Sequence, residues 1–263
     1  MTVSFDLISD LHVETWPEPF DWTGMATSII CVVAGDISRD RELVYSTLEH
    51  LGQCYKAVIY IDGNDEHRYS LSNLQQSVQE HKERVKQIPN VIYLLDNVVV
   101  IDGLGFVGVN GWWTFDFDNA QSYDQSKEWF VNHYKVDKQA VDQIEAHAFT
   151  DVQYLSKSIK RLQTHQDVSK LVVVTHTVPD PELVEHDIDL EGTHRLNCLG
   201  NNHILKSFIE DTENKIETWC FGHYHGDIDK SVNGVRFVNN CRGRANTDWC
   251  KSVYNPKKIF VDV

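Results

Sequence analysis

The stretch "VIYIDGNDEHRY" (residues 58–69) holds the first evidence for how this chain folds. Its first four residues, Val58 to Ile61, form an apolar run with the length and composition of a buried strand. Side chains capable of binding a metal follow the turn at Asp62-Gly63: Asn64, Asp65, Glu66 and His67. One such cluster is equally typical of a surface turn. The sequence predicts a metal site only if other strands are also followed by side chains that can bind a metal.

Short apolar runs rich in β-branched residues recur along the chain and predict nine strands. They lie at residues 3–8, 28–34, 57–61, 98–101, 104–109, 171–175, 218–221, 235–238 and 258–263. Several of these runs lack polar alternation, which is typical of strands buried on both faces. Helical segments lie between them, and this alternation predicts an α/β protein. No repeat or Pro/Gly/Ser linker interrupts the sequence, so we predict one domain over residues 1–263.

Three segments have the pattern of helices. Residues 70–88 carry a capping box, Ser72 with Gln75, and Pro89 follows them. Residues 138–165 also predict a helix, with a break expected near Phe149, and residues 201–212 predict a third. Residues 116–133 are polar and aromatic without a clear period, so we expect an excursion or lid over one end of the sheet.

Five of the predicted strands are followed by side chains that bind metals. These side chains are Asp10, His12, Asp36, Asn64, His176, His223 and His225. Ligands in open α/β sheets bind beyond the carboxyl ends of the strands, so the seven groups are expected to converge on one pocket. Seven nitrogen and oxygen donors are too many for one tetrahedral zinc site. They suit two metals that share a carboxylate and lie roughly 3.5–4 Å apart.

The composition restricts the classes of ligand. The 263 residues include 24 Lys and Arg and 39 Asp and Glu, which gives a net charge of −15. Such a surface repels polyanions and argues against duplex nucleic acid as a partner. A small phosphorylated ligand held by local cations or metals is compatible with it.

The sequence also bears on the compartment. None of the six cysteines forms a CxxC pair, which favours free thiols in a reducing compartment. We see neither a secretory signal nor a run of about 20 apolar residues that could span a membrane. The expected location is therefore cytoplasmic and away from membranes.

Five short motifs in order resemble those of the calcineurin-like metallophosphoesterase superfamily. They are "SDLH" (9–12), "AGDI" (34–37), "DGNDE" (62–66), "VVTH" (173–176) and "GHYH" (222–225). The resemblance implies an α/β sandwich of two facing mixed sheets flanked by helices, with the metals at one sheet edge. It also implies a dinuclear enzyme that hydrolyses a small phosphomonoester or phosphodiester, such as that of a nucleotide, by attack of a metal-bridging hydroxide.

The resemblance assigns the donors to two metal ions. Asp10, His12 and His225 would hold one ion. Asn64, His176 and His223 would hold the other, and Asp36 would bridge them. Mixed His, Asp and Asn donors suit Mn²⁺, Fe or Zn, of which we expect Mn²⁺.

One position departs from the superfamily pattern. The usual motif is G-N-H-[DE], but Asp65 stands where the resemblance implies a histidine that protonates the leaving oxygen or steadies the phosphate. The reference pKa of Asp is about 3.9 and that of His about 6.5, so Asp65 should be ionised and unable to donate a proton. His67 could supply the missing imidazole with Asp65 as its partner, or it could be an exposed loop residue.

Arginine and tryptophan side chains are candidates for substrate binding. Four arginines could bind a phosphate through their planar guanidinium groups: Arg39, Arg68, Arg195 and Arg242. Trp112 and Trp113 could stack on a base, although aromatic residues are more often part of the core.

The departure at Asp65 leaves a second function open, namely a metal-bound binding or scaffold protein of the same fold with weakened catalysis. A dinuclear hydrolase of another bond is disfavoured, because the sequence lacks the H-x-H-x-D-H run of the metallo-β-lactamase type.

Overall fold

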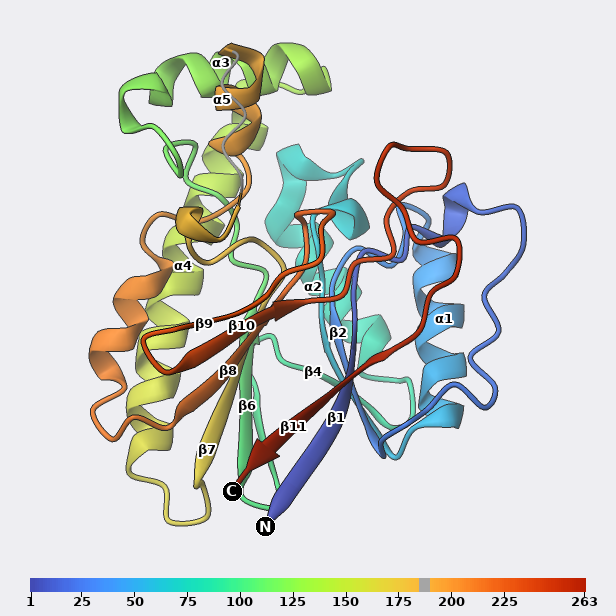
Figure 1. Cartoon of the computed structure of the whole chain (residues 1–263). Helices are drawn as coiled ribbons and strands as arrows, with labels where there is room; N and C mark the ends of the chain where they lie inside the picture. The colour runs from blue at the N-terminus through green and yellow to red at the C-terminus, as the bar shows by residue number, and fades with distance from the viewer. Residues whose placement is uncertain (185–189) are drawn as a thin grey trace.

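The computed structural model describes residues 1–184 and 190–263, in which two β-sheets face each other (Figure 1). The first has the strand order β11-β1-β2-β3-β4 and the second the order β5-β6-β7-β8-β10-β9. The strands of the first sheet are β11 (Lys257–Asp262), β1 (Thr2–Ile8), β2 (Ile30–Ala34), β3 (Ala57–Ile61) and β4 (Val91–Tyr93). Those of the second are β5 (Val98–Ile101), β6 (Leu104–Val109), β7 (Lys170–Thr175), β8 (Ile216–Phe221), β10 (Val235–Asn239) and β9 (Asp229–Val232).

Each sheet has a parallel centre and an antiparallel edge. Strands β1 to β4 run parallel to one another, and β11 pairs with β1 in the antiparallel sense. In the second sheet β6, β7, β8 and β10 are parallel, with β5 and β9 antiparallel at the edges. Since the parallel strands of a sheet point the same way, their carboxyl ends meet at one edge.

The two sheets pack on a shared apolar core. Phe5 of β1 and Phe106 of β6 meet edge to face with ring centroids 5.8 Å apart, and both are fully buried. A bridge between Ser9 and Cys241 joins the end of the first sheet to the segment that follows the second. This sandwich of two mixed sheets confirms the predicted fold class.

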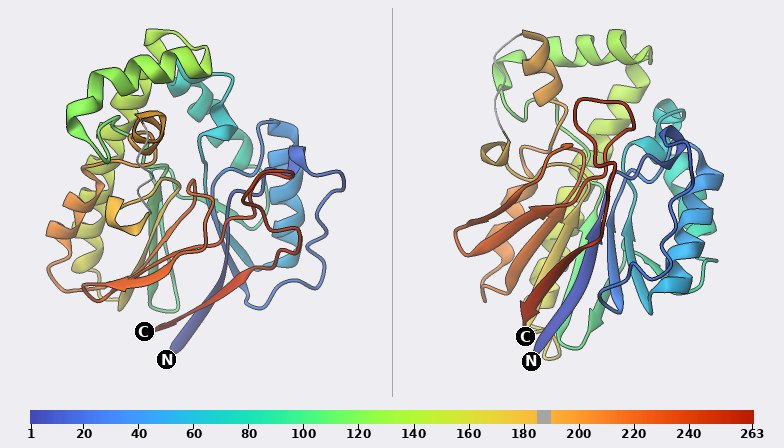
Figure 2. Two further views of the ribbon diagram at one scale, coloured as in Figure 1. Left: turned by 45° about the horizontal axis from the view of Figure 1, so that its top comes forward. Right: turned by 45° about the vertical axis from the view of Figure 1, so that its right-hand side comes forward.

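Helices cover both outer faces of the sandwich (Figure 2). Helices α1 (Arg41–Cys54) and α2 (Leu74–Val85) pack on the first sheet, whereas α4 (Lys138–Gln163) packs on the second beside the 3₁₀ segment η6 (Ile204–Glu210). Helices α3 (Tyr123–Tyr134) and α5 (Leu190–Leu196) contact each other beyond one end of the strands. This position agrees with the lid expected from residues 116–133.

Two details of the predicted helices are wrong. Ser72 does not cap a helix, because α2 begins at Leu74 and the Ser72 hydroxyl donates instead to Asp137 Oδ1 at 2.7 Å. Helix α4 runs without a break through Phe149, whose side chain is 66% exposed and so imposes no packing constraint there. Among the described residues, five helices and strands lay outside those expected from the sequence: the helices α1, α3 and α5 and the short strands β4 and β9.

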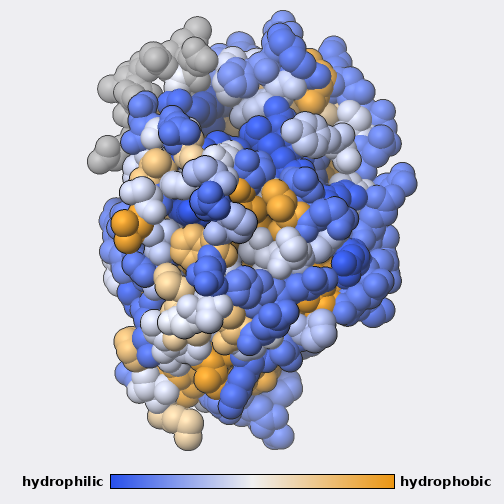
Figure 3. Space-filling model, turned by 90° about the vertical axis from the view of Figure 1, so that its right-hand side faces the viewer, coloured by the Kyte–Doolittle hydropathy of each residue, from blue (hydrophilic) through white to orange (hydrophobic). Residues whose placement is uncertain are grey.

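One face of the surface can be described by its hydropathy. The face on the α1 side of the molecule is mostly hydrophilic, with apolar groups in smaller patches (Figure 3). In the part of the chain that the structure describes, no helix combines the length and the apolar character needed to cross a bilayer.

Candidate metal centre

The seven side chains predicted as metal ligands all lie at one edge of the sandwich. Each follows the carboxyl end of β1, β2, β3, β7 or β8 within four residues. Two of the resulting groups place their donor atoms within 4.8 Å of one another. The groups are Asp10 with His12 and His225, and Asp36 with His176 and His223.

The first group brings two imidazoles and a carboxylate together. The Nε2 atoms of His12 and His225 are 3.0 Å apart. Asp10 Oδ1 lies 3.4 Å from His225 Nε2 and 4.0 Å from His12 Nε2. Asp10 and His12 are fully buried. Three nitrogen and oxygen donors thus converge where water is largely excluded.

Asp36 links the two groups through its two oxygens. Its Oδ1 lies 3.3 Å from His176 Nε2, and its Oδ2 lies 3.9 Å from His12 Nε2. Asn64 Oδ1 is 3.1 Å from the same His176 nitrogen and so belongs to the second group. A bridging ligand needs one oxygen on each side, and Asp36 has this arrangement.

Two of the imidazoles are oriented by backbone carbonyls. His176 Nδ1 donates to Ala34 O at 2.9 Å, and His223 Nε2 donates to Cys198 O at 3.1 Å. Since a carbonyl can only accept, the other nitrogen of each ring is left to face the site, as in metal-binding histidines. Burial opposes a charge on His176, but the Asp36 and Asp10 carboxylates outweigh it and raise its pKa to about 10.

The backbone around the ligands is strained. Asp10, His12, Asp36 and His223 all have φ between 43° and 62°, a region that non-glycine residues rarely adopt. Such strain clusters at functional sites, where surrounding structure holds it in place. Gly35 has φ 80°, and a Cβ there would approach His176 Nδ1 to 2.6 Å. The donor set, its convergence and this cradle fit a pair of divalent ions.

Asp65 lies beside this centre but is paired with cations. Its Oδ2 accepts from Arg39 Nε at 3.1 Å and from Arg244 Nη2, and it lies 3.3 Å from His12 Nδ1. Burial and the Asp36 carboxylate oppose the ionisation of Asp65, yet His12 and Arg244 outweigh them and lower its pKa. Asp65 is therefore an ionised acceptor rather than a proton donor.

His67 is not at the site, contrary to the role suggested for it. Its Nε2 lies 2.6 Å from Asp62 Oδ2 and its Nδ1 lies 2.8 Å from Ser77 Oγ. The side chain is buried, with its ring centroid 6.2 Å from that of Trp112, and does not line the pocket. The imidazole that Asp65 contacts is His12, so the expected pairing of Asp65 with His67 is wrong.

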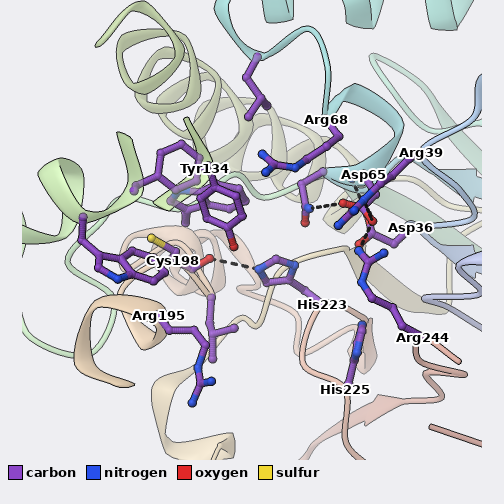
Figure 4. A pocket seen from close by; sticks show the side chains of 16 residues that line it. Asp36, Arg39, Asp65, Arg68, Tyr134, Arg195, Cys198, His223, His225 and Arg244 are labelled. Atoms are coloured by element: carbon purple, nitrogen blue, oxygen red, sulfur yellow. Dashed lines mark hydrogen bonds and ion pairs between the residues drawn. The ribbon is translucent and has the colours of Figure 1, made fainter. Parts of the chain in front are cut away.

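A pocket of about 230 Å³ opens in front of the donor groups (Figure 4). Four arginines and four aromatic residues contribute to its wall: Arg39, Arg68, Arg195, Arg244, Trp113, Trp129, Phe130 and Tyr134. Trp113 is stacked on the imidazole of His223 with ring centroids 5.7 Å apart. A pocket of this size suits a small ligand.

One of the four arginines predicted to bind a phosphate does not line the pocket. Arg242 is buried with its guanidinium 3.9 Å from the ring centroid of Trp16 and 4.7 Å from that of Phe20, away from the pocket. Arg244, which the sequence reasoning missed, lines the pocket instead. Its signal was its place after β10, whose carboxyl end lies at the same edge as the metal ligands. The aromatic residues of α3 were also missed, because their segment has no clear helical period.

Comparisons with known proteins place the fold. A search of protein-family models found no match. The crystal structure of phosphopantetheinyl hydrolase from Mycobacterium tuberculosis superposes with a TM-score of 0.68 over 94% of this chain and 93% of that one, at 18% identity. The chain has the calcineurin-like metallophosphoesterase fold.

Two further structures share this metallophosphoesterase fold more distantly. A putative 5′-nucleotidase from Staphylococcus aureus has a TM-score of 0.50 and 14% identity over 93% of this chain, which spans 49% of the nucleotidase. GAP50, the anchor in the inner membrane complex of Plasmodium, has a TM-score of 0.50 and 9% identity, covering 98% of this chain and 78% of that one.

A curated relative has no described function. The uncharacterized protein L509 of Acanthamoeba polyphaga mimivirus is 20% identical over 227 residues, which is 82% of this chain and 76% of the viral protein. The metallophosphoesterase fold is thus established here by structure.

Proposed function

We propose that this protein is a metal-dependent phosphoric ester hydrolase that acts on small phosphorylated molecules. The observation that carries the proposal is the convergence of seven nitrogen and oxygen donors on two adjoining groups linked by Asp36. When bound, a pair of divalent ions would lower the pKa of a water molecule and stabilise charge on phosphoryl oxygens.

The residues assigned to each ion follow from the two groups. Asp10, His12 and His225 would hold one ion, and Asn64, His176 and His223 the other, with Asp36 between them. The mixed donor set favours Mn²⁺, with Fe and Zn as alternatives.

The pocket residues would bind and orient the phosphate. Arg39 and Arg244 face the donor groups and offer planar N–H groups that match phosphoryl oxygens. Asp65 holds both guanidinium groups through one oxygen. The two arginine side chains therefore have less conformational freedom to lose when a phosphate binds. The 230 Å³ pocket supports a small substrate.

A substrate panel tests the proposal. Metal-free protein is supplied in turn with Mn²⁺, Fe²⁺ or Zn²⁺ and assayed with bis-p-nitrophenyl phosphate and p-nitrophenyl phosphate. We expect turnover that depends on the added metal, together with about two ions bound per chain by elemental analysis. Two bound ions without turnover of any phosphate ester would contradict the enzyme and favour the second candidate below.

A second candidate is a metal-bound binding or scaffold protein with the same fold. Two observations favour it. Asp65 occupies the place of the usual proton donor and is ionised, and one structure of the same fold is described as an anchor. The four arginines in the pocket favour the enzyme, since a scaffold has no need of so many cations beside a metal centre.

A further inference from the structure

Strand β11 forms one edge of the first sheet. It pairs with β1 and with no other strand in the part of the chain that the structure describes. Proteins usually protect such an edge with charges, proline or a very short strand, because its unpaired N–H and C=O groups can bind another strand. β11 has six residues (Lys257–Asp262), and it carries the aromatic side chain of Phe260, which is 61% exposed. This edge therefore has the features of an interaction surface.

The hydrogen bonds to β1 show which backbone groups of β11 are left for another strand. Met1 N donates to Val263 O at 2.9 Å, and Val263 N donates to Met1 O at 2.8 Å. Residues that bond to the neighbouring strand alternate with residues that do not in an antiparallel pair. Val263 faces β1, so the N–H and C=O groups of Lys258, Phe260 and Asp262 point away from β1. These three residues offer the groups that an added strand would bind.

The side chains of the same three residues lie on the outer face of the sheet. Lys258, Phe260 and Asp262 are exposed. The alternate residues Ile259 and Val261 are buried in the core between the two sheets. Since side chains of a strand alternate between its faces, β11 presents a row of one cation, one aromatic ring and one carboxylate.

The two charges of this row have no ion-pair partner among the residues that the structure describes. Lys258 Nζ donates to Thr27 O at 2.6 Å, and Asp262 Oδ1 accepts from Thr2 Oγ1 at 2.6 Å. Both of these contacts are exposed to solvent. Opposite charges four residues apart on an open edge are therefore free to pair with charges on another strand.

We propose that β11 pairs with β11 of a second copy of this chain, antiparallel and about a two-fold axis at Phe260. Each Phe260 then faces the other, and Lys258 of each copy faces Asp262 of the other copy. The backbone groups that point away from β1 bond across the axis. The two five-stranded sheets join into one continuous sheet. This interface between copies is independent of the proposed hydrolase activity.

Charge selects this register over its neighbours. Only every second residue of β11 has outward backbone groups, so the partner strand can shift only in steps of two residues. Such a shift places Phe260 opposite Lys258 or opposite Asp262 and leaves the remaining charge without its partner. The register centred on Phe260 instead forms two pairs of opposite charges and one pair of aromatic rings, both of which stabilise neighbouring antiparallel strands.

The location of this edge leaves the metal pocket open. β11 runs to the C-terminus at the end of the sandwich away from helices α3 and α5 (Figure 1). Helix α3 contributes Trp129 and Phe130 to the wall of the metal pocket. One strand from each copy buries less surface than the roughly 1,200 Å² of a standard stable interface, and each copy carries a charge of −15. We therefore expect a weak and reversible dimer.

Sedimentation equilibrium of the full chain tests the pairing. Between about 10 µM and about 1 mM protein, the weight-average mass should rise from that of one chain towards that of two, as for a weak interface. A chain that stays monomeric over this whole range would overturn the proposal.

Charge reversal tests the register. Lys258→Asp and Asp262→Lys each place like charges opposite one another in both pairs, and each should raise the Kd of the dimer by at least about 10-fold. The double variant Lys258→Asp/Asp262→Lys exchanges the charges and should restore the Kd to within about threefold of wild type. An unchanged Kd in the single variants, or a double variant as weak as either of them, would overturn the proposal.

Lys230→Asp is the matched control for the change in net charge. Lys230 is an exposed lysine of β9, the edge strand of the other sheet. Its reversal should leave the Kd unchanged. A loss as large as that in Lys258→Asp would mean that net charge or the β9 edge controls the association, which would overturn the pairing through β11.

Phe260→Pro tests the backbone contacts. Proline removes the outward N–H but no bond to β1, so the variant should remain folded by circular dichroism and lose the dimer. Phe260→Ala keeps the N–H and removes the ring, so it should raise the Kd by about 3–10-fold, and it decides the matter if the proline variant does not fold. A wild-type Kd in the folded proline variant, or in the alanine variant, would overturn the proposal.

Discussion

At the scale of single residues, Gly63 controls where the Asp36 carboxylate lies. A Cβ on Gly63 would overlap Asp36 Oδ1 and come within 2.5 Å of the Asp36 backbone nitrogen. Asp36 is the residue that links the two donor groups, so its displacement should affect both. The position of the Asp36 carboxylate therefore depends on the absence of a side chain at Gly63 as well as on the ligands themselves.

We predict that Gly63→Ala lowers the free energy of unfolding by about 1–3 kcal/mol and weakens Mn²⁺ binding. Urea unfolding and calorimetric titration measure the two effects. Gly24→Ala is the control, because Gly24 has φ 76° and open space around it, so alanine strains the backbone without touching the metal centre. Unchanged Mn²⁺ affinity in Gly63→Ala would contradict the predicted displacement.

The ligand assignments give a second prediction at this scale. Asp36→Ala and His223→Ala should each abolish metal-dependent turnover without unfolding the protein, because each removes one donor from a site made of seven. Activity with added Mn²⁺ and far-UV circular dichroism measure the two halves of the prediction. Wild-type rates in either variant would remove that residue from the metal centre.

At the scale of elements, α4 shows how one helix supports the second sheet. Asp137 caps it by accepting from Ala140 N at 3.0 Å, and its apolar side buries residues such as Leu155 and Ile159. Phe149 points away from this core, which is why the helix continues through a residue where a break was expected.

We predict that Leu155→Ala destabilises the protein by about 2–5 kcal/mol, as expected for a buried leucine. Phe149→Ala is the matched control and should change the stability by less than about 0.5 kcal/mol, since its side chain is 66% exposed. Urea unfolding of both variants measures the difference. Similar values would mean that α4 does not bury the face that the structure shows.

Asp151 joins α4 to the segment after β6. Its Oδ2 accepts from Gly111 N at 2.7 Å and from Trp112 N at 3.2 Å, which places the neighbouring Trp113 at the pocket. Burial raises the pKa of Asp151 to about 8, so its carboxyl group is protonated in the folded protein at neutral pH.

The raised pKa of Asp151 predicts how stability depends on pH. The unfolded chain releases this proton near pH 4, whereas the folded protein keeps it up to about pH 8. The Asp151 contribution therefore falls as pH rises from 4 to 8, by at most about 6 kcal/mol. Asp151→Asn keeps an acceptor oxygen but has no proton to lose, so its stability relative to wild type should rise across this range. Parallel unfolding curves at all pH values would contradict the assignment.

At the scale of the whole molecule, two sheets bring their strand ends to one edge and concentrate charge there. Asp10 and Asp36 remain ionised because neighbouring histidines outweigh the effect of burial and hold the pKa of each carboxyl well below its usual range. A site that joins five strand ends should couple metal binding to the stability of both sheets.

We predict that Mn²⁺ stabilises the folded protein by mass action. At a free concentration 100 times its Kd, the free energy of unfolding should rise by about 2.7 kcal/mol if the unfolded chain does not bind the metal. Urea unfolding with and without Mn²⁺ measures the rise, and Asp36→Ala is the control that should show little of it. No rise in the wild type would argue against a metal site built from both sheets.

Sequence patterns predicted which side chains converge at the sheet edge, and they did so for a physical reason. Apolar runs mark buried parallel strands, and parallel strands carry whatever follows them to a common edge. The seven donors, from Asp10 to His225, could be named because each stands within four residues of such a strand. Strand β4 was missed because it has only three residues, and strand β9 because its four residues are mostly polar and exposed.

The sequence by itself determined the α/β class, most of the strands and which side chains stand at their carboxyl ends, since these depend on local periodicity. Only the tertiary structure decided which loop residues reach the pocket. Arg242 and Arg244 are two residues apart, so the alternation of an extended chain would point both side chains to the same side. Arg242 nevertheless packs on Trp16, whereas Arg244 faces the metal groups. The position of the His67 side chain was likewise decided by the tertiary structure, because the direction of a loop side chain depends on contacts with residues distant in sequence.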